Sequence, residues 1–66
     1  MRFTDFTLPE CNYFREVCNF TDDELAIFNL RAKDKSVVQI SMELCMSEST
    51  VKRISKKIKA KIYKVL

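Results

Sequence analysis

The stretch Ser36–Lys64, SVVQISMELCMSESTVKRISKKIKAKIYK, decides the fold of this chain. Its apolar residues recur at helical spacing in two runs, the first over residues 37–44 and the second over residues 48–65. Only residues 45–47 separate the two runs, and this connection is too short to reverse the chain fully. Two helices joined by such a turn cross at a steep angle, so the first can brace the second while the second presents one face outward. The sequence therefore predicts a helix-turn-helix.

The outward side of the second predicted helix is strongly basic. Ser47 is a suitable N-cap, because its hydroxyl can accept a backbone N–H of the first turn, and Glu48 lies favourably near the positive end of the helix. Seven cations then follow without an acid among them: Lys52, Arg53, Lys56, Lys57, Lys59, Lys61 and Lys64. A helix with one apolar stripe and one positive flank fits the major groove of DNA. A basic helix is also compatible with an acidic membrane surface or with simple solvation.

The pattern resembles the helix-turn-helix of LuxR-type regulators and, less closely, region four of bacterial sigma factors. The resemblance extends from Phe20 to about Lys61, and its most specific part is the run Ser47-Glu48-Ser49-Thr50-Val51-Lys52. The other residues that carry it are Phe20-Thr21, Ile27-Phe28, Ala32, Ser36, Ile40 and Leu44. This resemblance implies that the second helix of the motif binds DNA.

Two positions depart from the LuxR-type pattern. Asp34 stands where that family usually has Gly, and Ser41 stands where it has a small residue, often Ala. Asp tolerates the left-handed conformation better than most residues and Ser adds only one oxygen, so we expect the fold to accept both changes. The fourth helix, through which LuxR-type domains dimerise, has no counterpart after Leu66. The resemblance therefore leaves open whether and how this chain dimerises.

The composition favours one small all-α domain. Hydrophobic residues make up 47% and charged residues 32% of the 66 residues, and with no Gly and one Pro the chain has few β-turn signals. Residues 1–34 hold four cations and seven acids, whereas residues 35–66 hold eight cations and two acids, so a polyanion should face the C-terminal half. Three cysteines without a signal peptide indicate a reducing cytoplasm. Cys11 and Cys18 are expected to be small buried residues.

Helix start signals divide the chain into four predicted helices, at about residues 8–18, 22–33, 37–44 and 48–65. The capping residues are predicted to be Thr7 with Glu10, Thr21 with Glu24, and Ser36. Residues 1–6 show no regular pattern and are predicted to be a flexible arm, and residues 7–66 are predicted to form a single helix-turn-helix domain. The fold class that follows is a small all-α bundle of about four helices.

Helical periodicity places one face of each predicted helix inward. The expected central core consists of Leu25, Phe28, Ile40, Leu44, Val51, Ile54 and Ile58. The first helix is expected to bury Leu8, Cys11, Phe14 and Cys18. LuxR-type domains need not have this first helix. It is expected either to enlarge the small core or to pack against a second subunit.

The outward residues of the final helix are the main candidate DNA contacts. Base edges are expected to be contacted by Lys52, Arg53 and Lys56, because lysine and arginine donate to guanine O6 and N7. Phosphates are expected to be contacted by Lys35, Ser36, Ser47, Ser49, Thr50 and Lys57. Gln39 is expected to be solvated, with a phosphate or partner contact as the alternative. A metal site at Asp22, Asp23 and Glu24 is disfavoured, since consecutive helix residues point in different directions.

These features predict sequence-specific binding to double-stranded DNA by a cytoplasmic transcriptional regulator. Two alternatives stay open: a sigma-like module that contacts RNA polymerase, and a protein-interaction adaptor whose last helix pairs with an acidic partner. An enzyme is not expected, because the sequence has no histidine, no glycine-rich phosphate loop and no cysteine with a visible base. No cofactor, metal or membrane partner is expected. A homodimer is expected, through apolar surface of the first helix or around Ile62, Tyr63 and Leu66, since two recognition helices read paired half-sites.

Overall fold

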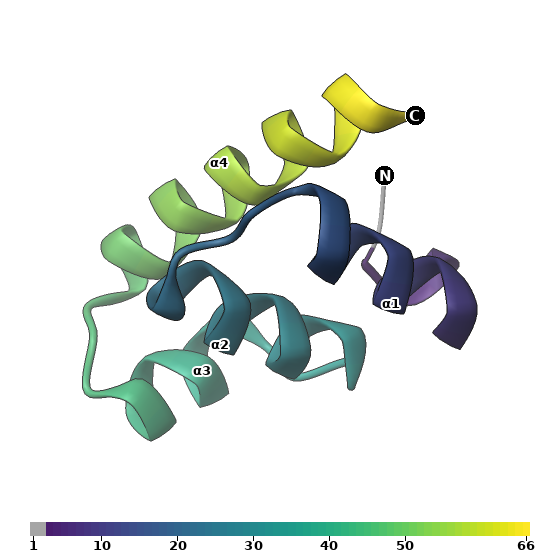
Figure 1. Ribbon diagram of the computed structural model, residues 1–66. Helices are drawn as coiled ribbons and strands as arrows, with labels where there is room; N and C mark the ends of the chain where they lie inside the picture. Colours follow the sequence, from purple (N-terminus) through teal and green to yellow (C-terminus); the bar gives the residue numbers. More distant parts are fainter. Residues whose placement is uncertain (1–2) are drawn as a thin grey trace.

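The computed structural model describes residues 3–66, and within them it contains helices and no strand. In chain order the elements are the 3-10 helix η1 (Phe3–Asp5) and the α-helices α1 (Leu8–Val17), α2 (Asp22–Ala32), α3 (Val37–Leu44) and α4 (Glu48–Val65). The predicted all-α fold with four α-helices is confirmed. The long helix α4 packs across α2 and α3, and its C-terminal half approaches α1 (Figure 1). The pair α3 and α4 forms the helix-turn-helix.

Each α-helix begins at a polar cap. Thr7 and Thr21 form the predicted capping boxes, in which the threonine hydroxyl accepts the backbone N–H of the glutamate three residues later and that glutamate accepts the threonine N–H. Ser36 caps α3 in the same way, because the side chain of Gln39 accepts its backbone N–H at 2.9 Å. Gln39 is exposed to solvent as expected, and its side chain has this capping role in addition. Ser47 caps α4 by accepting the Thr50 N–H at 3.1 Å, as predicted.

Three non-glycine residues adopt positive φ at the connections between helices. Asn19, Asp34 and Cys45 have φ of 51°, 65° and 54°. Asn and Asp tolerate this conformation comparatively well, so Asp34 serves at the position where the LuxR-type pattern has Gly. Cys45 ends α3 in the left-handed conformation, and the N–H groups of Cys45 and Met46 both donate to the carbonyl of Ser41. This closes the end of α3 and directs the chain into α4.

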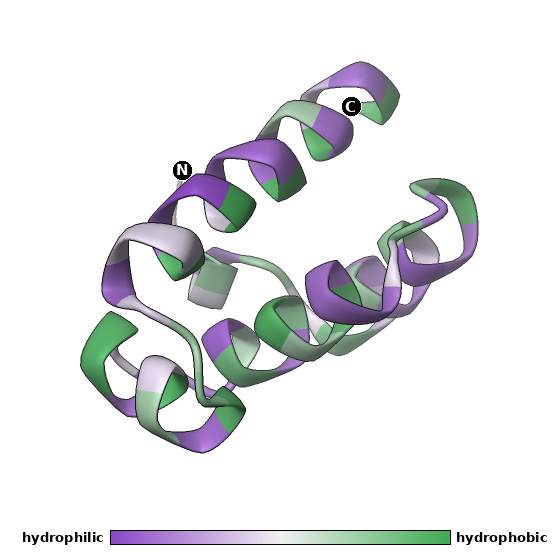
Figure 2. Cartoon of the chain, turned by 90° about the vertical axis from the view of Figure 1, so that its left-hand side faces the viewer, coloured by the Kyte–Doolittle hydropathy of each residue, from purple (hydrophilic) through white to green (hydrophobic). Residues whose placement is uncertain are grey.

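The central core is built around six side chains with no exposed surface: Ile27, Phe28, Ile40, Val51, Ile58 and Ile62. Figure 2 shows the hydrophobic residues of α4 facing the other helices and its hydrophilic residues lying outside. Two expected core residues, Leu44 and Ile54, are only partly buried at its edge. The prediction for Leu25 is wrong, because α2 turns Glu24, Ile27 and Phe28 inward and leaves Leu25 half-buried beside them.

Residues 3–6 correct the prediction of a flexible arm. Phe3 lies in η1 with only 3% of its surface exposed, and its ring meets that of Phe28 edge-on at 5.9 Å. The Phe6 ring meets that of Phe14 on α1 at 4.8 Å. These aromatic contacts are made with residues distant in sequence, so no local pattern announces them. Residues 1–2, the start of the predicted arm, lie outside the described residues.

The first helix buries three of the four residues expected on its inner face. Cys11, Phe14 and Cys18 join the core, but Leu8 is 70% exposed at the first turn of α1. The prediction for Leu8 is therefore wrong, because the start of α1 extends past the helices that cover its later turns. Among residues 3–66, no helix is both long and apolar enough to cross a lipid bilayer.

Candidate nucleic-acid interface

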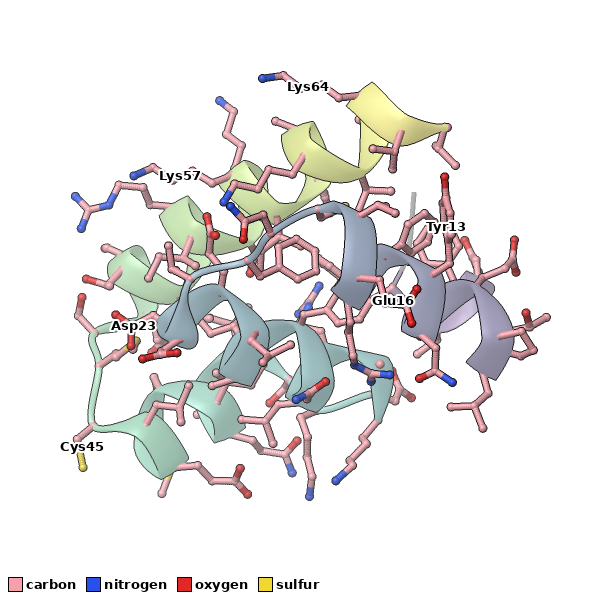
Figure 3. The ribbon with its side chains drawn as sticks, viewed as in Figure 1. Tyr13, Glu16, Asp23, Cys45, Lys57 and Lys64 are labelled. Carbon is pink, nitrogen blue, oxygen red and sulfur yellow. The ribbon has the colours of Figure 1, made fainter. Side chains whose placement is uncertain are left out.

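The outer side of α4 carries the candidate DNA-binding surface. Helix geometry, at about 100° per residue, separates an inner side holding Val51, Ser55 and Ile58 from an outer side. The exposed cations of the helix are Lys52, Arg53, Lys56, Lys57 and Lys64. We call this group the basic strip. Lys57 and Lys64 point away from the rest of the protein (Figure 3). All three residues predicted to contact base edges belong to the strip.

Two of the seven cations of α4 do not belong to the basic strip. The Lys61 ammonium donates to Glu24 Oε1 at 2.5 Å, and it also lies 6.0 Å from the centre of the Phe20 ring. The Lys59 ammonium lies 5.6 Å from the centre of the Phe3 ring. Both side chains are half-buried. The picture of a uniformly positive flank is therefore wrong, because packing against α2 and η1 diverts these two lysines from solvent.

The ion pair between Glu24 and Lys61 fixes α4 against the start of α2. Burial raises the pKa of the Glu24 carboxyl, but hydrogen bonds from Lys61 and Thr21 and the charge of Lys61 outweigh burial, so the pKa lies below its ordinary value. Glu24 therefore stays ionised at neutral pH. The same lysine acts on Cys18, where burial raises the thiol pKa and the Lys61 charge opposes part of that rise. Cys18 is accordingly a neutral core thiol.

Five of the six residues predicted to contact phosphates fall into two groups at opposite ends of α3, and the sixth, Lys57, lies in the middle of α4. Lys35 and Ser36 precede α3, whereas Ser47, Ser49 and Thr50 begin α4. With a rise of about 1.5 Å per residue, α3 separates the groups by roughly 12 Å. Ser49 and Lys57 are exposed, and Lys35 is half-buried.

Three of the four predicted serine and threonine contacts, Ser36, Ser47 and Thr50, also take part in capping hydrogen bonds. The Ser36 hydroxyl accepts the Gln39 N–H at 3.1 Å, which leaves its own proton available to a second acceptor. The hydroxyls of Ser47 and Thr50 are hydrogen-bonded to each other at 2.8 Å. Only one of their two protons is used in that bond. Ser36 at the start of α3 can therefore still donate its O–H to a phosphate. The Ser47–Thr50 pair at the start of α4 can do the same with its second O–H.

Two polar residues, Arg31 on α2 and Ser55 on α4, were not expected to form part of a site. Arg31 lies on α2, and it shares a cavity with Lys52, Ser55 and Lys59 of α4. Ser55 could have been found from the sequence, since it stands four residues after Val51 and three before Ile58, within the apolar stripe. A hydroxyl at such a position is buried and needs a partner. The participation of Arg31 depends on the packing of two helices and has no local signal.

Comparison with known families gives a match that covers most of the chain. A family model described as bacterial regulatory proteins, luxR family, matches residues 19–63, which is well over half of the chain. The matched residues contain α2, α3 and nearly all of α4, whereas η1 and α1 lie outside the match. Comparison with curated proteins and with solved structures gives no significant match.

Proposed function

The chain belongs to the luxR family of bacterial regulatory proteins, and from this premise we propose that it regulates transcription by inserting α4 into the major groove of double-stranded DNA. The observation that supports this mode of binding is the basic strip on α4. The inner side of α4 is packed into the core through its buried residues, so the cations on the outer side are carried by a rigid helix. A rigid α-helix with cations on one side fits the width of the major groove. Such binding would take place in the cytoplasm.

Within this proposal the contacts divide between bases and phosphates. Arg53 lies on the outermost line of α4, and we assign it with Lys52 and Lys56 to base edges. We assign Lys57, Lys35 and the capped helix starts to the DNA backbone. The residues of those starts are Ser36, Ser47, Ser49 and Thr50. Helix N-termini attract phosphate through their free N–H groups and dipole.

We further propose that the protein binds DNA as a homodimer. Large apolar side chains stay exposed on α1 and on the last turns of α4: Leu8, Tyr13, Val17, Tyr63 and Leu66. Ile62 is fully buried, so it cannot belong to a dimer surface as the sequence suggested. Tyr13 lies beside the C-terminal end of α4 (Figure 3), and α1 contacts α4 directly. Exposed apolar surface of this kind favours association. Contact with RNA polymerase stays a prediction of the resemblance to sigma factors.

Two substitutions on the basic strip test the proposed DNA contacts. Arg53→Ala should weaken binding to a site selected from random duplexes by about 1 to 3 kcal/mol and should affect a scrambled site much less, because a base-edge hydrogen bond exists only with the right base. Lys57→Ala should weaken both sites alike and reduce the salt slope by roughly one unit, because a phosphate contact carries no sequence information. Fluorescence anisotropy across a salt series measures both effects.

The two variants are matched, since each removes one exposed cation from the same helix. If both lowered the affinities for the selected and scrambled sites equally, α4 would be an electrostatic clamp and not a reading helix. If neither changed duplex binding, the basic strip would have no role in DNA recognition and the proposed mode of binding would be wrong.

A further inference from the structure

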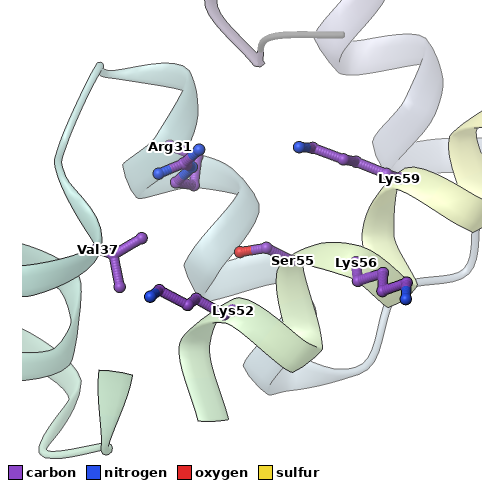
Figure 4. Close-up of a pocket in the computed structure, with 6 residues that line it drawn as sticks. All are labelled: Arg31, Val37, Lys52, Ser55, Lys56 and Lys59. Carbon is purple, nitrogen blue, oxygen red and sulfur yellow. The ribbon is translucent and has the colours of Figure 1, made fainter. Parts of the chain in front are cut away.

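A half-open cavity of about 190 Å³ lies where α2, α3 and α4 meet (Figure 4). Its lining consists of Arg31, Val37, Lys52, Ser55, Lys56 and Lys59. Four of these side chains are cations, namely Arg31, Lys52, Lys56 and Lys59. Since a liquid water molecule occupies about 30 Å³, the cavity accommodates a tetrahedral oxyanion together with water.

The aromatic ring of Phe3 contacts two of the cations that line the cavity. The Arg31 guanidinium lies 5.3 Å and the Lys59 ammonium 5.6 Å from the centre of this ring. Cation–π contacts favour both placements, but they also bring two like charges together. In Figure 4 the charged ends of Arg31 and Lys59 project toward a common space, whereas that of Lys52 is directed toward Val37 and that of Lys56 points away. An anion in this space would relieve the repulsion.

The hydroxyl of Ser55 gives an independent reason to place an anion there. Ser55 is only 7% exposed, and its Oγ has no hydrogen-bond partner among the described residues. Figure 4 shows this oxygen directed into the space between Arg31 and Lys52. A buried hydroxyl without a partner is destabilising, and native proteins nearly always satisfy such groups with protein, water or an ion. An oxyanion in the cavity would accept the Ser55 proton.

We propose that this cavity binds a phosphate group, which Ser55 contacts through its hydroxyl and Arg31 and Lys59 through their N–H groups. The planar guanidinium suits two oxygens of one phosphate, and the lysine adds a point charge. The group is either a phosphate of the DNA backbone or a free phosphate. The proposal does not depend on sequence-specific DNA reading. Phe3 lies outside the residues matched by the family model, so this chain supplies part of the arrangement from its own N-terminal segment.

Thermal denaturation with inorganic phosphate tests the binding of a free anion. Phosphate should raise the Tm saturably above that in chloride of equal ionic strength, because a ligand that binds only the folded state stabilises it. Lys59→Ala should abolish this rise. Ser55→Ala should raise the Tm without phosphate, since an unpaired hydroxyl is removed, and should weaken phosphate binding about tenfold, since a hydrogen bond to a charged group is lost. Lys33→Ala, an equal charge change at the exposed end of α2 and outside both the cavity and the basic strip, is the matched control.

Binding to a short random-sequence duplex distinguishes the two sources of phosphate. If the cavity takes a backbone phosphate, Ser55→Ala and Lys59→Ala both weaken duplex binding, and inorganic phosphate competes with the duplex. If it takes a free phosphate, Ser55→Ala binds the duplex as tightly as the wild type does, and the protein binds phosphate and duplex together. The proposal is overturned if phosphate stabilises no more than chloride while Ser55→Ala leaves duplex binding unchanged. It is overturned as well if Lys33→Ala reproduces the losses of Lys59→Ala.

Discussion

At the scale of single residues, Glu24 has two structural roles. Its carboxylate accepts the Thr21 N–H in a capping box and also pairs with Lys61 of α4. The first contact fixes the start of α2, and the second joins that start to a helix 37 residues away in sequence. A cap signal in the sequence predicts the first role only. The second arises when two helices pack, since it needs a lysine that the linear pattern assigns to the solvent face.

Replacing this carboxylate tests both roles. Glu24→Gln should lower the free energy of unfolding by about 1 to 3 kcal/mol at neutral pH, because the negative charge that attracts the Lys61 ammonium is lost. The amide oxygen can still accept the Thr21 N–H, so the cap itself survives. Urea denaturation measures the change. The matched control is Glu10→Gln, because Glu10 caps α1 in the same manner but is exposed and has no ion pair among residues 3–66.

The effect should also depend on pH. The pKa of Glu24 is lower in the folded state than in the unfolded state, where it is about 4.3. Its contribution is therefore complete above the unfolded-state pKa and disappears as the pH falls through the folded-state pKa. The difference in stability between the wild type and Glu24→Gln should shrink over that acidic interval. A difference that stayed constant down to low pH would show that the carboxylate charge contributes nothing.

At the scale of helices, one side of α4 anchors it to the core, and the residues on that side are buried to different extents. Ile58 is fully buried, whereas Ile54 is only partly buried at the edge of the core. Ile58→Ala should cost about 2 to 5 kcal/mol, which is a large share of the stability of so small a protein. Ile54→Ala removes the same atoms and should cost distinctly less, so it is a matched control. Denaturant unfolding of both variants gives the comparison. Equal losses would place Ile54 in the core after all.

The helices show what a sequence can and cannot predict. The starts of all four α-helices follow from local caps such as Thr7 and Ser47, whose hydrogen bonds lie within one turn. Which side of a helix turns toward the core depends on the helices that pack against it. The sequence pattern therefore predicted wrongly that Leu25 lies in the core, and it did not identify Ser55 as buried. It also treated Phe3 as part of an arm, since the ring that it contacts belongs to a distant helix. The basic strip could be predicted from the charge pattern alone. The contacts that hold Lys59 and Lys61 away from solvent could not, because they depend on Phe3 and Glu24 in other elements.

At the scale of the whole molecule, the exposed apolar residues determine whether two copies associate. Light scattering at high micromolar concentration should give the mass of a dimer. Tyr13→Glu should shift the protein toward the monomer, because it places a charge in the proposed interface. Met42→Glu is the control, since Met42 on α3 is also an exposed apolar residue, at 74%, but lies on a different helix. A monomeric wild type at that concentration, or an equal effect of both substitutions, would contradict the proposed dimer surface.

The turn between α3 and α4 has a practical consequence for experiments on the intact protein. Cys45 is exposed in that turn, while Cys11 and Cys18 are buried and the pKa of Cys18 is raised. Thiol reactivity follows exposure and thiolate character, so maleimide chemistry should favour the turn over the core. The native sequence thereby offers one attachment point for a fluorophore, a spin label or a DNA-cleaving reagent, next to the start of α4. A tethered cleavage reagent would mark which strand positions the recognition helix approaches, without any engineered cysteine.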